Sequence, residues 1–114
     1  MDFQLPEEQK LFQESVRGFA ERHLSDGALK RAHNHEYPYD VAKLMSEQGL
    51  LGITIKEEDG GIGGTLLDAV LAIEQVSQVC PRSADVIQAG NFGAIRTFAE
   101  YATPEQKEEY LPGL

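Results

Sequence analysis

The sequence predicts an all-α fold: an antiparallel bundle of five or six helices in a single domain over residues 1–114. Three observations lead to this prediction. Apolar residues recur at three- and four-residue spacing, proline and glycine separate those stretches, and no segment is clearly a strand. The composition, 41% hydrophobic and 25% charged residues, is ordinary for one globular domain. Because the connections are short, neighbouring helices should run antiparallel.

The first helix should begin at Pro6, because proline lacks an N–H that would be unpaired at the first helical position. Glu7 and Glu8 then place negative charge at the positive end of the helix dipole. Ser25-Asp26-Gly27 interrupts or ends this helix, and a short second piece should run over residues 28–33. The apolar residues of the first helix share one face and are Leu11, Phe12, Val16, Phe19, Ala20 and Leu24.

The middle of the chain contains two further helices joined by an apolar connector and a glycine-rich loop. Tyr37-Pro38 breaks the chain, a helix opens at Tyr39 or Asp40, and Gly49 ends it in a left-handed cap. Residues 50–55 are expected to be a buried connector, and residues 56–64 a turn-rich loop. Thr65 should cap the next helix, with Asp68 three residues on. That helix is apolar almost all round, so it should be buried inside the bundle as far as Cys80-Pro81.

The last third of the chain predicts two helices. Ser83 is expected to cap a helix that continues to Phe98, with Gly90 and Gly93 inside it. Each interior glycine costs about 1 kcal/mol against alanine, so the close approach of another helix or a ligand should account for them. Thr103-Pro104 opens the final helix, and Pro112 marks its end.

Charge and cysteine content exclude several classes of protein. The net charge of -9, with 19 acidic against 10 basic residues, argues against nucleic-acid partners and anionic membrane surfaces. The apolar runs are much shorter than the roughly 18 residues of a membrane span. The single cysteine, Cys80, cannot form an intrachain disulfide, which favours a reducing compartment and a small core residue. We therefore predict a cytoplasmic protein without a membrane span.

None of the motifs that suggest a phosphate or metal site is complete. A P-loop needs lysine after its last glycine, and a dinucleotide fingerprint needs a third glycine where Leu66 stands. We expect residues 60–64 to be a tight structural loop. The acidic run 57–59 lacks the alternating spacing of a calcium loop. His33 and His35 are two residues apart, which points their rings in different directions on a helix, so no metal site is predicted.

Several landmarks together, in order along the chain, resemble acyl-CoA dehydrogenases. They are residues 3–9 (FQLPEEQ), 16–21 (VRGFAE), 48–53 (QGLLGI) with the glycine loop that follows, and 102–112 (ATPEQKEEYLP). The resemblance implies the N-terminal helical domain of a three-domain enzyme whose β domain and C-terminal helical domain are absent from these residues. It implies an FAD-dependent oxidation of an acyl-CoA thioester to a trans-2-enoyl-CoA. It also implies electron transfer to a carrier protein and a homotetramer when full-length.

The resemblance places Ala84, Gln88 and Phe92 on the wall of the acyl-CoA pocket. Their spacing of four residues puts them on one helix face. Each also has a simpler interpretation, since Gln88 could bond a neighbouring helix and Phe92 could belong to the core. No catalytic residue is expected here, because the family's FAD lies mainly between the second and third domains and its catalytic base in the third. The fragment alone should be inactive and bind no FAD.

A second hypothesis from a different class is a non-enzymatic helical interaction module, or a split subunit that a partner chain completes. The reading frame after Leu114 separates the two hypotheses, because continuation into a β domain would favour the enzyme. We also expect an exposed apolar surface where such a domain would pack.

Overall fold

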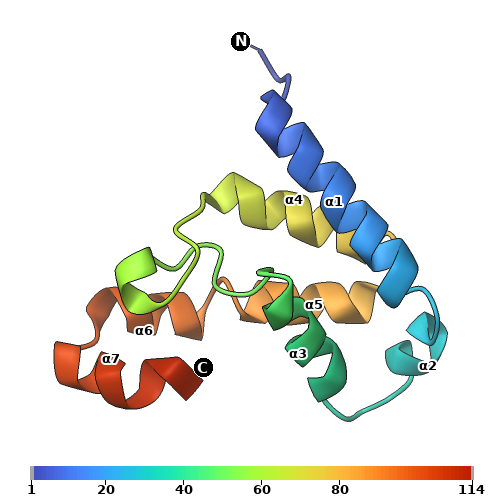
Figure 1. The fold of residues 1–114 in the computed structure, drawn as a ribbon. Helices are drawn as coiled ribbons and strands as arrows, with labels where there is room; N and C mark the ends of the chain where they lie inside the picture. Colours follow the sequence, from blue (N-terminus) through green and yellow to red (C-terminus); the bar gives the residue numbers. More distant parts are fainter. Residues whose placement is uncertain (1, 114) are drawn as a thin grey trace.

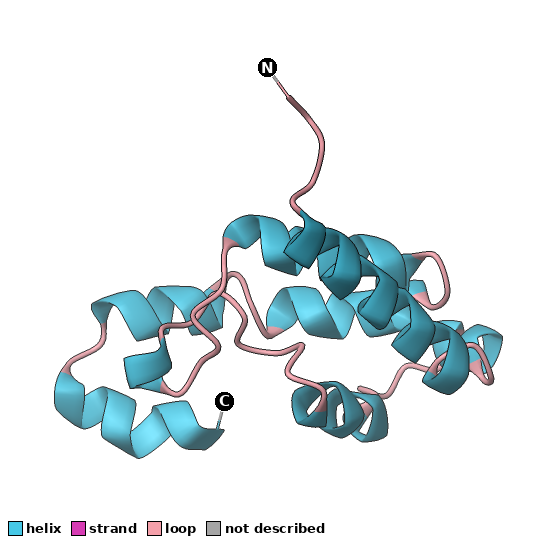
Figure 2. Cartoon of the chain, turned by 45° about the horizontal axis from the view of Figure 1, so that its top comes forward, coloured by secondary structure: helices cyan, strands magenta, loops and turns pink. Residues whose placement is uncertain are grey.

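The computed structural model describes residues 2–113, and these residues form α-helices, two short 3-10 helices and no strand (Figures 1 and 2). The prediction of an all-α fold is confirmed. The 3-10 helices are η1 (Glu57–Asp59) and η2 (Leu111–Gly113). The α-helices are α1 (Glu7–His23), α2 (Ala28–Ala32), α3 (Tyr39–Glu47), α4 (Leu66–Ser77), α5 (Pro81–Ala89), α6 (Ala94–Tyr101) and α7 (Pro104–Tyr110).

Helix α5 is the centre of the arrangement. It packs along α4 and also contacts α2 and α3, while α1 packs on α4. Helices α6 and α7 extend to the opposite side of the molecule from α1 and α2 (Figure 1). The molecule measures 42 × 41 × 22 Å, so it is a flattened body about two helix diameters thick. In so flat a molecule, several helices have a face that no other helix of the chain covers.

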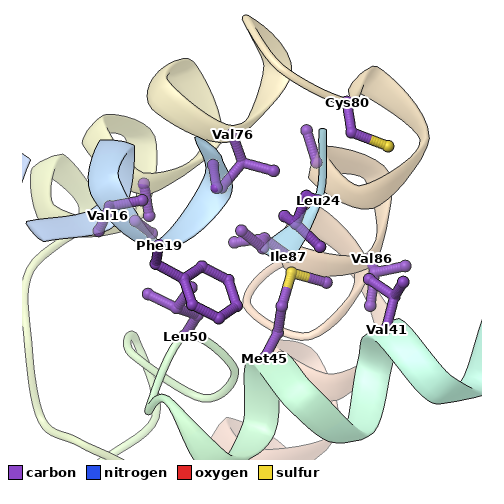
Figure 3. Packing of buried hydrophobic residues seen from close by; sticks show 14 of the residues in the cluster. Val16, Phe19, Leu24, Val41, Met45, Leu50, Val76, Cys80, Val86 and Ile87 are labelled. Atoms are coloured by element: carbon purple, nitrogen blue, oxygen red, sulfur yellow. The ribbon is translucent and has the colours of Figure 1, made fainter. Parts of the chain in front are cut away.

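The core lies between α1, α3, α4, α5 and the connector over residues 50–55. Figure 3 shows side chains from these elements pointing toward one another, with Met45 of α3 directed toward Ile87 of α5. Both of these side chains have no exposed surface. The connector is buried through Leu50, Ile53 and Ile55, as predicted, and it forms no strand. The core is thus assembled from helix faces that the periodicity indicated, together with one irregular apolar segment.

The helix ends follow local sequence signals closely. Thr65 and Thr103 each form a complete capping box, the first with Asp68 and the second with Gln106. Gly49 follows α3 with a left-handed φ of +73°. These three predictions are confirmed.

The prediction of one helix over residues 83–98 is wrong. The segment is divided into α5 and α6, and α5 begins at Pro81 rather than after a Ser83 cap. The Ser83 hydroxyl is buried and donates to Cys80 Sγ at 3.0 Å. Before α6, Gly93 adopts φ +66° and ψ -128°, a conformation open essentially only to glycine. Gly93 thus supplies the backbone conformation from which α6 begins.

Helix α4 is buried on one side only, contrary to the prediction. Ala72 and Val76 have no exposed surface, because α1 and α5 cover that side. On the other side Leu66, Leu67 and Val70 keep 55%, 44% and 44% of their surface exposed. Helix α4 therefore has one apolar face that packs in the core and a second apolar face that is exposed to solvent.

Candidate functional site

The three predicted pocket residues lie along α5 and the turn that follows it. Ala84 and Gln88 are one helical turn apart within α5. Phe92 lies beyond the end of the helix, but its N–H donates to the Gln88 carbonyl at 2.9 Å. The main chain therefore continues one further helical turn, which keeps Phe92 next in line after Gln88. The three residues thus follow one another along α5 and the turn after it, and their common face stays a prediction.

The three side chains differ in how much surface they offer. Ala84 is 5% exposed and belongs to the core cluster, and Phe92 packs against that cluster while remaining partly exposed. Gln88 is exposed, and within residues 2–113 its side chain makes no hydrogen bond. Bonding to a neighbouring helix therefore does not account for Gln88. Of the three, Gln88 and part of Phe92 are accessible, and Ala84 is almost fully buried.

An apolar cavity of about 590 Å³ lies on the flank of α5 that faces α6, and the sequence reasoning did not identify it. None of the three predicted residues lines it. Its walls carry no carboxylate, lysine or histidine, and apart from the phenol groups of Tyr37 and Tyr110 they offer apolar contact. The lining residues are Tyr37, Leu51, Val86, Ala89, Gly90, Ala94, Ile95, Phe98 and Tyr110. The apolar residues of α6 point to this cavity only once it is known that α5 ends at Ala89 and that a separate helix follows.

The glycine-rich loop has no free amide with which to hold a phosphate. All five N–H groups of residues 60–64 donate to main-chain carbonyls of residues 52–57, at 2.7 to 3.0 Å. A side chain at Gly61 would place its Cβ 2.1 Å from the Ile55 carbonyl oxygen, so the loop is packed tightly on the connector. The prediction of a structural loop is confirmed, because phosphate-binding glycine loops direct their amides outward.

Cys80 is a fully buried core residue, as predicted. Burial alone would raise the pKa of its thiol, but the Ser83 hydroxyl and main-chain N–H and the Arg31 guanidinium act against it, and the pKa is lowered overall. The Nε–H of Arg31 lies 3.4 Å from Cys80 Sγ. This bond connects α2 to the start of α5. Because solvent does not reach the sulfur, the thiol is not an accessible nucleophile.

Neither a metal cluster nor a membrane-spanning helix is found in the described part of the chain. Across residues 2–113, no three His, Cys, Asp or Glu side chains gather into a ligand group. The helices described there are also too short or too polar to cross a bilayer.

Comparison with known proteins shows the family of the chain. The profile described as the acyl-CoA dehydrogenase N-terminal domain matches residues 6–114. A short-chain specific acyl-CoA dehydrogenase of Clostridium acetobutylicum is 34% identical over 97% of this chain and 29% of its own length. An NADH-dependent acryloyl-CoA reductase of Anaerotignum propionicum is 39% identical over 100% of this chain and 29% of its own length.

A solved structure gives the same result at the level of the fold. It comes from work on the electron transferring flavoprotein of Acidaminococcus fermentans and on flavin-based electron bifurcation. One of its chains matches with a TM-score of 0.85 at 32% identity, over 97% of this chain and 29% of that chain. This chain thus spans about three-tenths of the length of the relatives that it matches. The match over nearly all its residues shows that the chain belongs to the acyl-CoA dehydrogenase family, as the N-terminal helical domain.

Proposed function

We propose that this domain supplies one wall of the acyl pocket in an FAD-dependent acyl-CoA dehydrogenase, which oxidises an acyl-CoA thioester to a trans-2-enoyl-CoA. The observation that carries the proposal is the accessible surface of Gln88 and Phe92, along α5 and the turn after it, with Phe92 packed against the core. The printed names of the two relatives support the substrate class, since one is a dehydrogenase and the other a reductase of a CoA thioester.

We assign each of the three residues a role in setting the chain length, by size for Phe92 and Ala84 and by polarity for Gln88. Phe92 limits the depth of the pocket, because its ring is partly buried and supported from behind. Gln88 places a polar amide along an otherwise apolar stretch, which disfavours a long alkyl chain at that point. Ala84 acts through its small size, since a larger side chain there would push outward from a nearly closed core position.

The residues of this domain do not fit the flavin by themselves. The amides of the glycine loop are occupied within the chain, and the cavity beside α5 is lined by apolar residues and two tyrosines, with no charged side chain to hold a phosphate. Bound FAD would supply the hydride acceptor in the whole enzyme, and we infer that residues outside 1–114 would hold it. The catalytic base is likewise assigned to the remainder of the enzyme.

The open apolar surfaces indicate where the rest of such an enzyme would pack. Leu66, Leu67 and Val70 of α4 form one of them, and the cavity between α5 and α6 forms another. Apolar side chains that gather at a surface in this way are typical of interfaces. We extend the proposal to a homotetramer in the cytoplasm that delivers electrons to a carrier protein. The alternative of a non-enzymatic module has no observation in its favour.

The proposal is tested in the full-length polypeptide that carries this domain, with straight-chain thioesters from butyryl-CoA to palmitoyl-CoA. Phe92→Ala should move the preference toward longer chains, changing the ratio of kcat/KM between long and short substrates by about tenfold. Leu29→Ala, at a position of α2 that is 75% exposed, is the matched surface control and should leave the ratio unchanged. Identical profiles for the parent protein and Phe92→Ala would remove this residue from the pocket wall.

A further inference from the structure

Asn91 is a buried polar residue, in the turn between α5 and α6, whose bonds the proposed function does not use. It has no exposed surface. Its Oδ1 accepts from the Thr54 N–H at 3.2 Å, and its Nδ2 donates to the carbonyls of Leu50 at 3.0 Å and Ile87 at 2.8 Å. A buried amide is costly unless it is bonded in this way. The side chain therefore holds one arrangement of the turn in place.

Asn91 determines where α5 ends. In a continuing helix the Ile87 carbonyl would receive the main-chain N–H of Asn91, four residues on. Here the side-chain amide of Asn91 takes that carbonyl, and its main-chain N–H turns to the Gln88 carbonyl at 3.3 Å. The Phe92 N–H donates to the same Gln88 carbonyl at 2.9 Å. The path of the chain from Gln88 to Phe92 thus depends on the bonds of the residue between them.

The turn is also attached to the buried connector. The Thr54 hydroxyl donates to the main-chain carbonyl of Asn91, and the Gly52 N–H donates to the Gly90 carbonyl at 2.9 Å. The two segments are in close contact, because a Cβ at Gly90 would lie 2.9 Å from Cδ2 of Leu51. Because the connector is part of the core, these bonds fix the position of the turn relative to the core.

We propose that Asn91 and Thr54 are positioning residues for the acyl wall, because their mutual bonds fix how far Phe92 reaches into the pocket relative to Gln88. This inference rests on the proposed function. It names two residues that touch neither the acyl group nor the flavin and yet set the chain-length preference. A shift of about 1 Å in a positioned group can change rates by up to about a hundredfold, so bonds of this kind are measurable in kinetics.

The test compares Thr54→Val with Thr54→Ser in the full-length enzyme. Valine keeps the shape of threonine and removes the hydroxyl that donates to the Asn91 carbonyl, whereas serine keeps that hydroxyl. Thr54→Val should change the long-to-short ratio of kcat/KM by about threefold or more, mainly through KM, and Thr54→Ser should retain the parent ratio. Asn91→Ala should shift the same ratio further, since it removes three bonds.

The control is Val76→Ala, at a fully buried position in α4 that takes no part in the hydrogen bonds of the turn. It should lower Tm and leave the chain-length ratio unchanged. If Thr54→Val lowers Tm in the same manner and leaves the ratio unchanged, the two residues are structural only and the inference is overturned. The proposed function would then still stand if Phe92→Ala shifts the ratio, and would fall with the inference if it does not. If Asn91→Ala does not fold, the Thr54 pair decides the question.

Discussion

The region from α1 to α5 and the region from α6 to η2 are both helical, but they are held together in different ways. Every residue of the buried core cluster comes from the first region. Of the described residues in the second, Ala99 is the one that is buried. The second region instead relies on the capping box at Thr103, on a Phe98–Tyr110 edge contact at 6.3 Å and on a bond between Lys107 and Asp59. Local signals set where a helix begins and ends, and burial stabilises it and couples it to the rest of the fold.

The largest contrast is expected between two isoleucines. Ile87→Ala removes a side chain with no exposed surface and should lower the free energy of unfolding by about 3 kcal/mol. Ile95→Ala removes a half-buried side chain that lines a cavity, and should cost about 1 kcal/mol. Urea denaturation followed by circular dichroism measures both. Equal losses would mean that the α6–η2 region is as firmly coupled as the core.

The two capping boxes sharpen the comparison because their chemistry is matched. Thr65→Ala should lower global stability by about 1 kcal/mol, since α4 is part of the cooperative core. Thr103→Ala should leave the urea midpoint nearly unchanged while amide hydrogen exchange in α7 becomes faster. A fall in the midpoint for Thr103→Ala comparable to that for Thr65→Ala would show that α7 unfolds together with the core.

The bond between α7 and η1 should contribute less. Lys107 Nζ lies 3.3 Å from Asp59 Oδ1, and the two side chains are 27% and 10% exposed. Lys107→Met should loosen α7 by less than about 1 kcal/mol and make its amide exchange insensitive to added salt. The exposed pair Arg17–Glu21 on α1 is the control, and Arg17→Met should not affect exchange in α7. If Lys107→Met slows that exchange, the pair does not hold the helix.

The smallest effect concerns the acid side of the pH profile. The Thr65 main-chain N–H, followed by bonds from Gln9 and the Thr65 hydroxyl, outweighs burial and lowers the pKa of Asp68 below its ordinary value of 3.8. A lowered folded-state pKa gives stability that is complete above 3.8 and is lost as the pH falls through the folded-state value. Asp68→Asn should remove this slope from stability measured between neutral and acidic pH. A slope equal to that of the parent protein would assign it to other carboxyl groups.

Local sequence signals account for most of the helix ends but not for the division between α5 and α6. Thr65, Thr103 and Gly49 act on neighbours within a few residues, so their roles could be predicted from spacing alone. Asn91 ends α5 partly through Thr54 and Leu50, which are 37 and 41 residues away in the chain. No periodicity within residues 83–98 contains that information.

The exposure of the candidate site residues could not be predicted from the sequence. The resemblance to the family placed Ala84, Gln88 and Phe92 on one face, but the core contacts of Ala84 depend on the helices that surround α5. In the same way, the apolar pattern of α4 could not tell which of its faces α1 and α5 would cover. Periodicity gives the faces of a helix, and tertiary contacts decide which of them meet other helices.

The glycine loop over residues 60–64 has a consequence for how such segments are interpreted in other proteins. The connector lies directly against Gly61 and Gly64, and Gly60 and Gly63 have φ values of +91° and +74°, which other residues rarely adopt. Conservation of these glycines in a related chain would therefore report folding and not nucleotide binding. A substitution at Gly61 should accordingly damage folding before it alters any ligand. A glycine-rich loop can bind an anion when its amides point outward. When they donate to carbonyls of the same chain, as they do here, the loop has a structural role, whatever the number of its glycines.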